Sequence, residues 1–162
     1  MLNNFSESKK GFTLIELLIT ILVFTTGILG IYLVIQRLFA SADYAKERVI
    51  AIYLAQEGVE IVRNIRDSNW LENTTWDDGL PSGSNFGVQY NRNHLLSGYG
   101  DKFLKIDNNG FYNYFSGQET KFKRKINIQK IDDHTLKIKV EVSWSERFSP
   151  VILEAKIYDW LP

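Results

Sequence analysis

The longest hydrophobic run in the chain lies near its N-terminus. From Phe12 to Ile35 a single charged residue, Glu16, interrupts apolar and small side chains. At a rise of about 1.5 Å per residue this run spans roughly 36 Å as a helix, enough for a bilayer core of about 30 Å. The pattern therefore predicts a helix that is apolar on all sides and can cross a membrane.

Beyond this run the apolar positions recur every three or four residues, which indicates one face of a helix. The positions are Leu38, Ala42, Ala45, Val49, Ile52, Ala55, Val59, Val62 and Ile65. Because no proline occurs before Pro81, we predict one continuous helix from Phe12 to Arg66. We expect its amphipathic second half to pack on a sheet.

The rest of the chain alternates between turn residues and short β-type runs, after a polar loop from Asp67 to Asn85. The predicted strands are Gly87–Tyr90, Phe103–Ile106, Phe111–Tyr114, Phe122–Ile131, Leu136–Trp144 and Val151–Tyr158. Turns at Asp107–Gly110 and Asp132–His134 would join them as an antiparallel meander. The predicted fold class is α+β, a long N-terminal helix packed on a small antiparallel sheet.

Composition removes several kinds of chemistry. The chain has 19 basic and 19 acidic residues, no cysteine and two histidines, so disulfides, thiolate zinc sites and cysteine nucleophiles are excluded. We find no spacing of serine, histidine, carboxylate or glycine typical of an active site. We therefore assign no catalytic residue, no metal ligand and no cofactor, and do not expect an enzyme.

Charges flanking the apolar run predict the membrane orientation. Lys9 and Lys10 precede it, whereas Arg37 is the first charge after it, which predicts that the N-terminus lies in the cytoplasm and the rest of the chain outside. A secretory signal peptide would have a shorter apolar core and a small-residue cleavage site. A plain anchor would not explain Glu16, since a carboxylate inside an apolar helix costs about 2.5–3.5 kcal/mol at the bilayer centre.

Cleavage between Gly11 and Phe12 would supply a partner for that carboxylate. The new α-amino group of Phe12 would lie one helical turn from Glu16, and the same pair could form between neighbouring copies.

The residues from Lys9 to Glu16, KKGFTLIE, followed by the apolar run, resemble the processing site of type IV pilins and pseudopilins. The resemblance implies that a prepilin peptidase cleaves after Gly11 and methylates Phe12, and that Glu16 guides subunit docking. The segment Ala51–Trp70, together with the final predicted strands, is similar to minor pilins. Many members carry a proline near the position of Leu33, which this chain lacks.

The resemblance implies a leader at 1–11, a transmembrane and assembly half-helix at 12–35, an amphipathic half-helix at 36–66, and a head at 67–162. It predicts a structural subunit of a type IV pilus or of a type II secretion-like pseudopilus. Expected partners are the prepilin peptidase, other pilin subunits, an assembly platform protein and the inner membrane. A signal-anchored membrane protein with a ligand-binding β domain stays open as the alternative.

Calcium and DNA are not expected as ligands. Acidic turns at Asp77 with Asp78 and at Asp132 with Asp133 lack the spaced ligands of a calcium loop. Alternating lysines could form a basic patch for DNA, but lysines on the outer face of a sheet more often serve solubility. These lysines are Lys121, Lys123, Lys125, Lys137 and Lys139.

Overall fold

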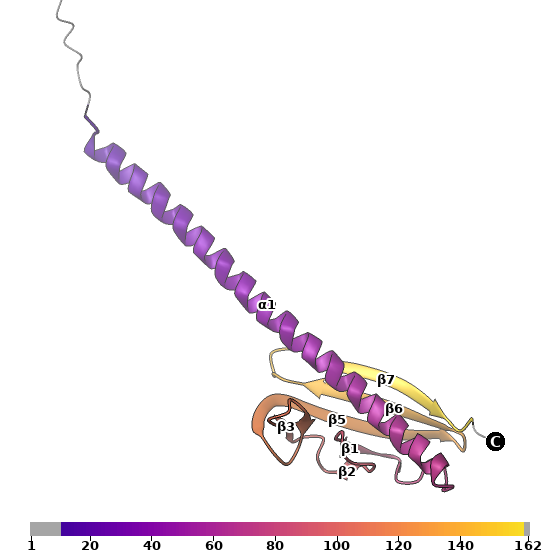
Figure 1. Cartoon of the computed structure of the whole chain (residues 1–162). Coiled ribbons are helices and arrows are strands. Elements are labelled where there is room, and N and C mark those ends of the chain that lie inside the picture. The colour runs from indigo at the N-terminus through magenta and orange to yellow at the C-terminus, as the bar shows by residue number, and fades with distance from the viewer. Residues whose placement is uncertain (1–10, 161–162) are drawn as a thin grey trace, which may run out of the picture. The chain divides into compact units, whose positions relative to one another are not determined.

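The computed structural model describes residues 11–160, in which helix α1 runs from Leu14 to Leu71 (Figure 1). The helix ends five residues later than Arg66, the predicted end. Asn73 adopts a left-handed backbone (φ 55°) and its amide donates to the Trp70 carbonyl, while the Thr74 amide donates to the Asn69 carbonyl. This pair of bonds is the Schellman ending, which Asn tolerates better than most residues.

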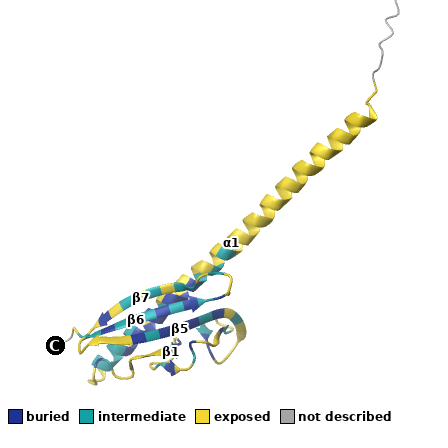
Figure 2. Cartoon of the chain, turned by 180° about the vertical axis from the view of Figure 1, so that it is seen from behind, coloured by how far each residue is buried: buried dark blue, intermediate teal, exposed yellow. Residues whose placement is uncertain are grey.

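The chain divides into two compact units, Met1–Tyr44 and Ala45–Pro162. In the first unit the described residues are almost all exposed, as the yellow ribbon in Figure 2 shows. The second unit holds the C-terminal part of α1 and the β-sheet, and it contains every buried residue in the part of the chain that the structure describes.

The sheet has seven strands, all paired antiparallel. They are β1 (Gly83–Gly87), β2 (Leu96–Ser97), β3 (Phe103–Ile106), β4 (Tyr112–Asn113), β5 (Gln118–Asp132), β6 (Thr135–Ser143) and β7 (Val151–Tyr158). The predicted α+β fold class, one long helix with a curled antiparallel sheet, is confirmed.

Strand β5 organises the sheet. One of its edges pairs first with β3 and then with β1, while its other edge pairs with β6, which in turn pairs with β7. The expected meander is confirmed for β5, β6 and β7, which lie side by side in Figure 1. Strands β1 and β3 instead share one edge of β5.

The sequence prediction located β3 and β7 correctly and misplaced the strand at Gly87–Tyr90. The paired residues there are Gly83–Gly87, because β1 takes its position from its partner β5 and from the Asn127 side chain, which accepts the amide of Asn85. Strand propensity depends strongly on such neighbours, so the polar segment gives little local signal. Strand β2 was missed, and β5 begins at Gln118 because its polar start pairs with β3.

The core of the head lies between α1 and the inner face of the sheet. Gly58 permits the closest approach, since a Cβ there would lie 3.0 Å from Val140 Cγ1 on β6. The predicted apolar face of β6 is confirmed, with every second residue from Leu136 to Trp144 buried. The helix residues that meet the sheet are Ala51, Leu54, Ala55, Gly58, Val59, Ile61, Val62 and Ile65.

The prediction of which helix residues face the sheet is wrong in the first half of the amphipathic segment. Val49 and Ile52 were expected to face the sheet, yet they are exposed, whereas Ala51 and Leu54 are buried. Between positions 49 and 55 apolar residues surround the helix, so spacing alone could not identify the face that the sheet would cover.

Candidate functional site

The predicted processing site lies at the start of the described chain. Gly11 has no neighbouring atoms around the position of a Cβ, and Phe12 is 85% exposed. Helix α1 begins two residues after Phe12. The Gly11–Phe12 peptide bond therefore lies in accessible, non-helical backbone, as a protease substrate requires. Lys9 and Lys10, the predicted basic leader residues, lie outside the described residues.

Thr13 and Glu16 form the start of the helix. The Glu16 amide donates to Thr13 Oγ1 over 3.3 Å, and the Leu17 amide donates to the Thr13 carbonyl over 3.2 Å. Thr13 is thus the N-cap, and the sequence Thr-Leu-Ile-Glu has the spacing of a capping box. The carboxylate of Glu16 stands in the first turn, where the helix dipole favours negative charge.

Three threonine side chains of the apolar half-helix are satisfied within the helix itself. Thr20, Thr25 and Thr26 each donate their hydroxyl to the carbonyl four residues earlier, over 2.6–2.9 Å. Hydroxyls bonded in this way can lie in hydrocarbon at little cost. Glu16 is the one charged side chain between Leu14 and Gln36.

Comparison with known families gives one match. Residues 8–32 match the prokaryotic N-terminal methylation motif. The chain carries the type IV pilin and pseudopilin signal. This signal marks a family of structural subunits that a prepilin peptidase processes. Comparisons with curated proteins and with solved structures found no significant match.

The pilin-type signal overlaps the one described helix that is long and apolar enough to cross a membrane, which begins at Leu14. Together they indicate membrane anchoring. The matched segment ends before the amphipathic half of α1, so it includes no part of the β-sheet.

In the pilin-like head, an ion pair between a buried arginine and a half-buried glutamate joins α1 to the sheet. Arg124 on β5 is fully buried, and its Nη1 donates to Glu57 Oε2 over 2.9 Å and to the Leu54 carbonyl over 3.1 Å. Its Nη2 donates to the Val88 carbonyl over 2.6 Å. Sequence reasoning missed this residue. The signal was an arginine at an inward position of an alternating strand, facing a helix that carries a carboxylate.

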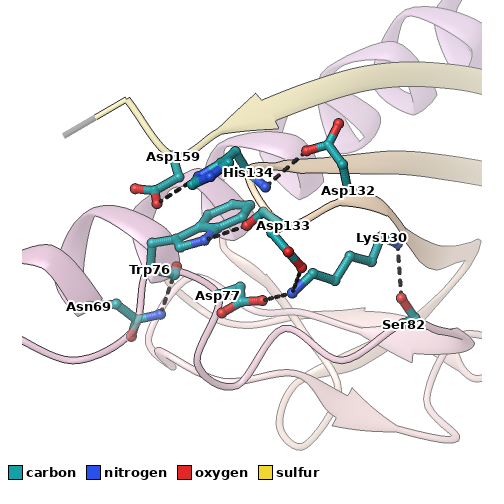
Figure 3. Close-up of polar contacts among 9 residues, drawn as sticks. All are labelled: Asn69, Trp76, Asp77, Ser82, Lys130, Asp132, Asp133, His134 and Asp159. Atoms are coloured by element: carbon teal, nitrogen blue, oxygen red, sulfur yellow. Dashed lines mark hydrogen bonds and ion pairs between the residues drawn. The ribbon is translucent and has the colours of Figure 1, made fainter. Parts of the chain in front are cut away.

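The structure brings the two acidic turns together, as Figure 3 shows. Lys130 lies between them, with Nζ 3.1 Å from Asp77 Oδ2 and 3.7 Å from Asp133 Oδ1. The hydrogen bond from Lys130 to Asp77 raises the pKa of Lys130, so the charged ammonium compensates the two carboxylates. Residues 11–160 contain no group of three or more metal-ligating side chains that could hold a metal ion.

The same turns are held by local hydrogen bonds. Asp132 Oδ1 accepts the His134 amide over 2.9 Å, which lowers the pKa of Asp132, and Trp76 Nε1 donates to the Asp133 carbonyl over 3.2 Å (Figure 3). Ring atom Nδ1 of His134 lies 3.4 Å from Asp159 Oδ2. These contacts fasten the loop that follows α1 to the β5–β6 turn.

The lysines of the outer sheet face do not form an uncompensated basic patch. Lys121 pairs with Glu47, Lys125 lies 2.7 Å from Asp101, and Lys137 lies 2.9 Å from Glu154. A further lysine, Lys123, lies over the Phe103 ring, 4.4 Å from its centroid. Carboxylates therefore compensate much of the charge that would attract a nucleic-acid backbone.

Proposed function

We propose that this chain is a structural subunit of a type IV pilus or of a type II secretion-like pseudopilus. The methylation motif at residues 8–32 carries the proposal, and the exposed Gly11–Phe12 bond and the apolar helix support it. In this proposal a prepilin peptidase removes residues 1–11 and methylates the Phe12 amine. The subunit acts by polymerising and performs no turnover.

Residues 12–35 form the membrane and assembly half-helix in this proposal, residues 36–66 the amphipathic half, and residues 67–162 the displayed head. The subunit begins as a single-pass inner-membrane protein with its head outside the cytoplasm. It then leaves the bilayer through an assembly platform protein and joins other pilin subunits in a fibre.

Glu16 supplies the driving force for docking in this scheme. The apolar surface around it favours hydrocarbon, whereas its carboxylate is unfavourable there by up to about 3 kcal/mol on insertion scales. A methylated amine of Phe12 from a neighbouring subunit, which keeps a positive charge, would offset that cost. Assembly would thus replace an unpaired carboxylate by an ion pair in an apolar setting.

The mature N-terminus tests the proposal directly. Mass spectrometry of the protein purified from its native membrane should find a chain that begins at methylated Phe12. A mature chain that begins at Met1 and remains a monomer would support the alternative, a signal-anchored protein whose head binds a ligand.

The Glu16→Ala variant tests assembly separately from processing. It should still be cleaved and inserted, while its incorporation into sheared fibres falls sharply, because only the docking charge is lost. Glu60→Ala is the matched control, since Glu60 is an exposed carboxylate of the same helix that pairs with Arg63. Equal incorporation of both variants would refute the role of Glu16.

A further inference from the structure

A polar recess of about 490 Å³ lies on the head at the C-terminal end of α1. Three segments that are far apart in the sequence form it: the end of α1 with the loop that follows, the end of β5 with its turn, and the residue after β7. Its lining includes Trp70, Asn73, Thr75, Asp77, Asp133 and Asp159. The recess lies roughly 40 Å along α1 from Ala45, the first residue of the head unit.

Hydrogen bonds hold the loop side of the recess in place. The Asn69 side-chain amide donates to the Trp76 and Asp78 carbonyls over 3.1 and 2.8 Å, and Thr74 Oγ1 donates to the Asn69 carbonyl over 3.2 Å. The bond from the Trp76 indole to the Asp133 carbonyl joins this loop to the β5–β6 turn (Figure 3). Because the recess is formed before a ligand arrives, binding there costs little ordering entropy.

The charges around the recess select the kind of ligand. Three carboxylates, on Asp77, Asp133 and Asp159, stand against one ammonium, on Lys130, and this excess of negative charge repels an anion. Lys130 already compensates Asp77 and Asp133, which weakens the attraction for a second cation. Carboxylate oxygens compensated in this way still accept hydrogen bonds. A neutral ligand with hydroxyl groups therefore suits the recess best.

Polar side chains of the lining have hydrogen-bonding capacity left for such a ligand. The Asn73 carboxamide and the Thr75 hydroxyl form no hydrogen bond with the residues that the structure describes. The Asp133 side chain is 93% exposed. A carboxamide offers two donors and one acceptor, a hydroxyl offers both functions, and a carboxylate accepts. Together these groups can both donate to and accept from the hydroxyls of one ligand.

Three of the four tryptophans of the chain gather at this end of the head. Trp70 and Trp76 line the recess, and Trp160 stands edge-on to Trp70, with ring centroids 5.0 Å apart and planes at 75°. Trp160 is nevertheless 66% exposed. An exposed indole offers a flat apolar surface beside the polar groups, on which the C–H groups of a sugar ring can pack.

We propose that the recess binds a neutral pyranose sugar of a surface glycan. The sugar ring would pack on Trp160 while its hydroxyls bond with Asn73, Thr75 and Asp133. Binding needs only the folded head, so it does not depend on assembly. Polymerisation, as proposed above, would present the recess in many copies and raise the avidity for a glycan-coated surface.

Titration of the full chain with disaccharides of different charge tests this binding. The chain is kept in a polyoxyethylene detergent, whose headgroup contains no sugar. Cellobiose and diacetylchitobiose are the neutral probes, chitobiose without its acetyl groups is the cationic probe, and digalacturonate is the anionic probe. Tryptophan fluorescence should change with at least one neutral probe, with a Kd of about 5 mM or lower. Both charged probes should bind more weakly than that neutral probe.

Two variants locate the bound sugar, with isothermal titration calorimetry as the readout. Trp160→Ala should weaken binding about fivefold or more, because the packing surface is lost. Asn73→Gly removes the carboxamide, while glycine accepts the left-handed backbone of that position (φ 55°), and it should weaken binding about threefold.

The matched control is Phe111→Ala, which removes a 50% exposed ring that does not line the recess. It should leave binding unchanged. Thermal unfolding of the Trp160→Ala and Phe111→Ala variants should match that of the wild-type chain, because both rings are exposed.

Four results would overturn the proposed sugar site. Neither neutral probe binds; the cationic probe binds most tightly, which would indicate an ammonium site; or the anionic probe binds most tightly, against the charge of the three carboxylates. The fourth is equal binding by Trp160→Ala and the wild-type chain, which would place the sugar elsewhere. None of these results bears on the methylated N-terminus, so the proposed function is tested separately.

Discussion

The two halves of α1 obey the same backbone rules and meet opposite surroundings. From Leu14 to Tyr44 the helix buries no side chain, although its residues are more apolar than those that follow. From Ala45 to Leu71 eight residues are buried against the sheet. Helix formation is therefore a local property here, whereas burial depends on what the rest of the chain, or another chain, places opposite.

The largest expected effect on stability concerns the second half of α1, which the sheet covers. Arg124→Met should lower the free energy of unfolding by about 3–5 kcal/mol, because Glu57 and two carbonyls lose their buried partner. Urea unfolding of the full chain in detergent micelles, followed by tryptophan fluorescence, measures it. Arg48→Met, which replaces an exposed arginine of α1, should change stability by less than about 0.5 kcal/mol.

A double variant measures how much of this loss comes from leaving Glu57 without its partner. Glu57→Leu added to Arg124→Met should recover much of the loss, since apolar replacement of both partners removes the unpaired charge. No recovery would show that the bonds from Arg124 to the Leu54 and Val88 carbonyls carry the stability.

The same substitution placed in each half sharpens the comparison. Gly58→Leu should lower the unfolding free energy of the head by about 1–3 kcal/mol, because the new side chain would collide with Val140 and Arg124. Gly27→Leu has open space around it and should leave the head's unfolding curve unchanged. Equal effects of Gly58→Leu and Gly27→Leu would mean that the head does not unfold independently of the apolar half-helix.

A smaller effect is expected at the start of the apolar half-helix. Thr13→Ala removes the side chain that accepts the Glu16 amide, at a cost of about 1 kcal/mol, so exchange of the Glu16 and Leu17 amides should accelerate roughly fivefold. Thr26→Ala should leave exchange in that first turn unchanged, since its hydroxyl only supplements a carbonyl of the helix ladder. The unfolding of the head should not respond to either variant.

The smallest expected effect concerns acid. Ion pairs or hydrogen bonds with Lys125, His134 and Lys137 lower the pKa values of Asp101, Asp132 and Glu154, respectively. A carboxyl with a depressed folded-state pKa stabilises the fold above its ordinary pKa, and that contribution is lost as the pH falls through the folded value.

The thermal stability of the head should accordingly fall as the pH drops below about 4. Lys137→Ala should make this acid dependence slightly shallower, because Glu154 loses its main partner. The control is Lys46→Ala, which removes an exposed lysine of α1, far in sequence from Glu154. These carboxyls are exposed, so the differences will be small beside those of Arg124 and Gly58.

Local chemistry accounts for what the sequence predicted well. The apolar run, the missing prolines and the turn at Asp107–Gly110 act within a few residues, and the structure shows the helix and that hairpin turn, with Gly110 at φ +85°. The end of the helix was missed because it depends on the conformation of Asn73, which propensity alone does not specify.

Features that depend on distant partners could not be predicted in this way. Strand β1 is polar and is positioned by β5, about forty residues later in the chain. Arg124 was not predicted from the sequence, because the alternating lysines beside it indicate only the outer face of strand β5. Its inward alternation with Phe122 and Ile126 was the available signal.

The order of the strands has a consequence for biogenesis. Strand β6 lies between β5 and β7, and β7 ends at Tyr158, close to the C-terminus. A ribosome delivers the apolar half-helix before strand β7, so the segment that could anchor the chain is available before the sheet can be completed. Until β7 pairs with it, one edge of β6 has unpaired backbone groups. A chain truncated before β7 would therefore be prone to aggregate through that edge.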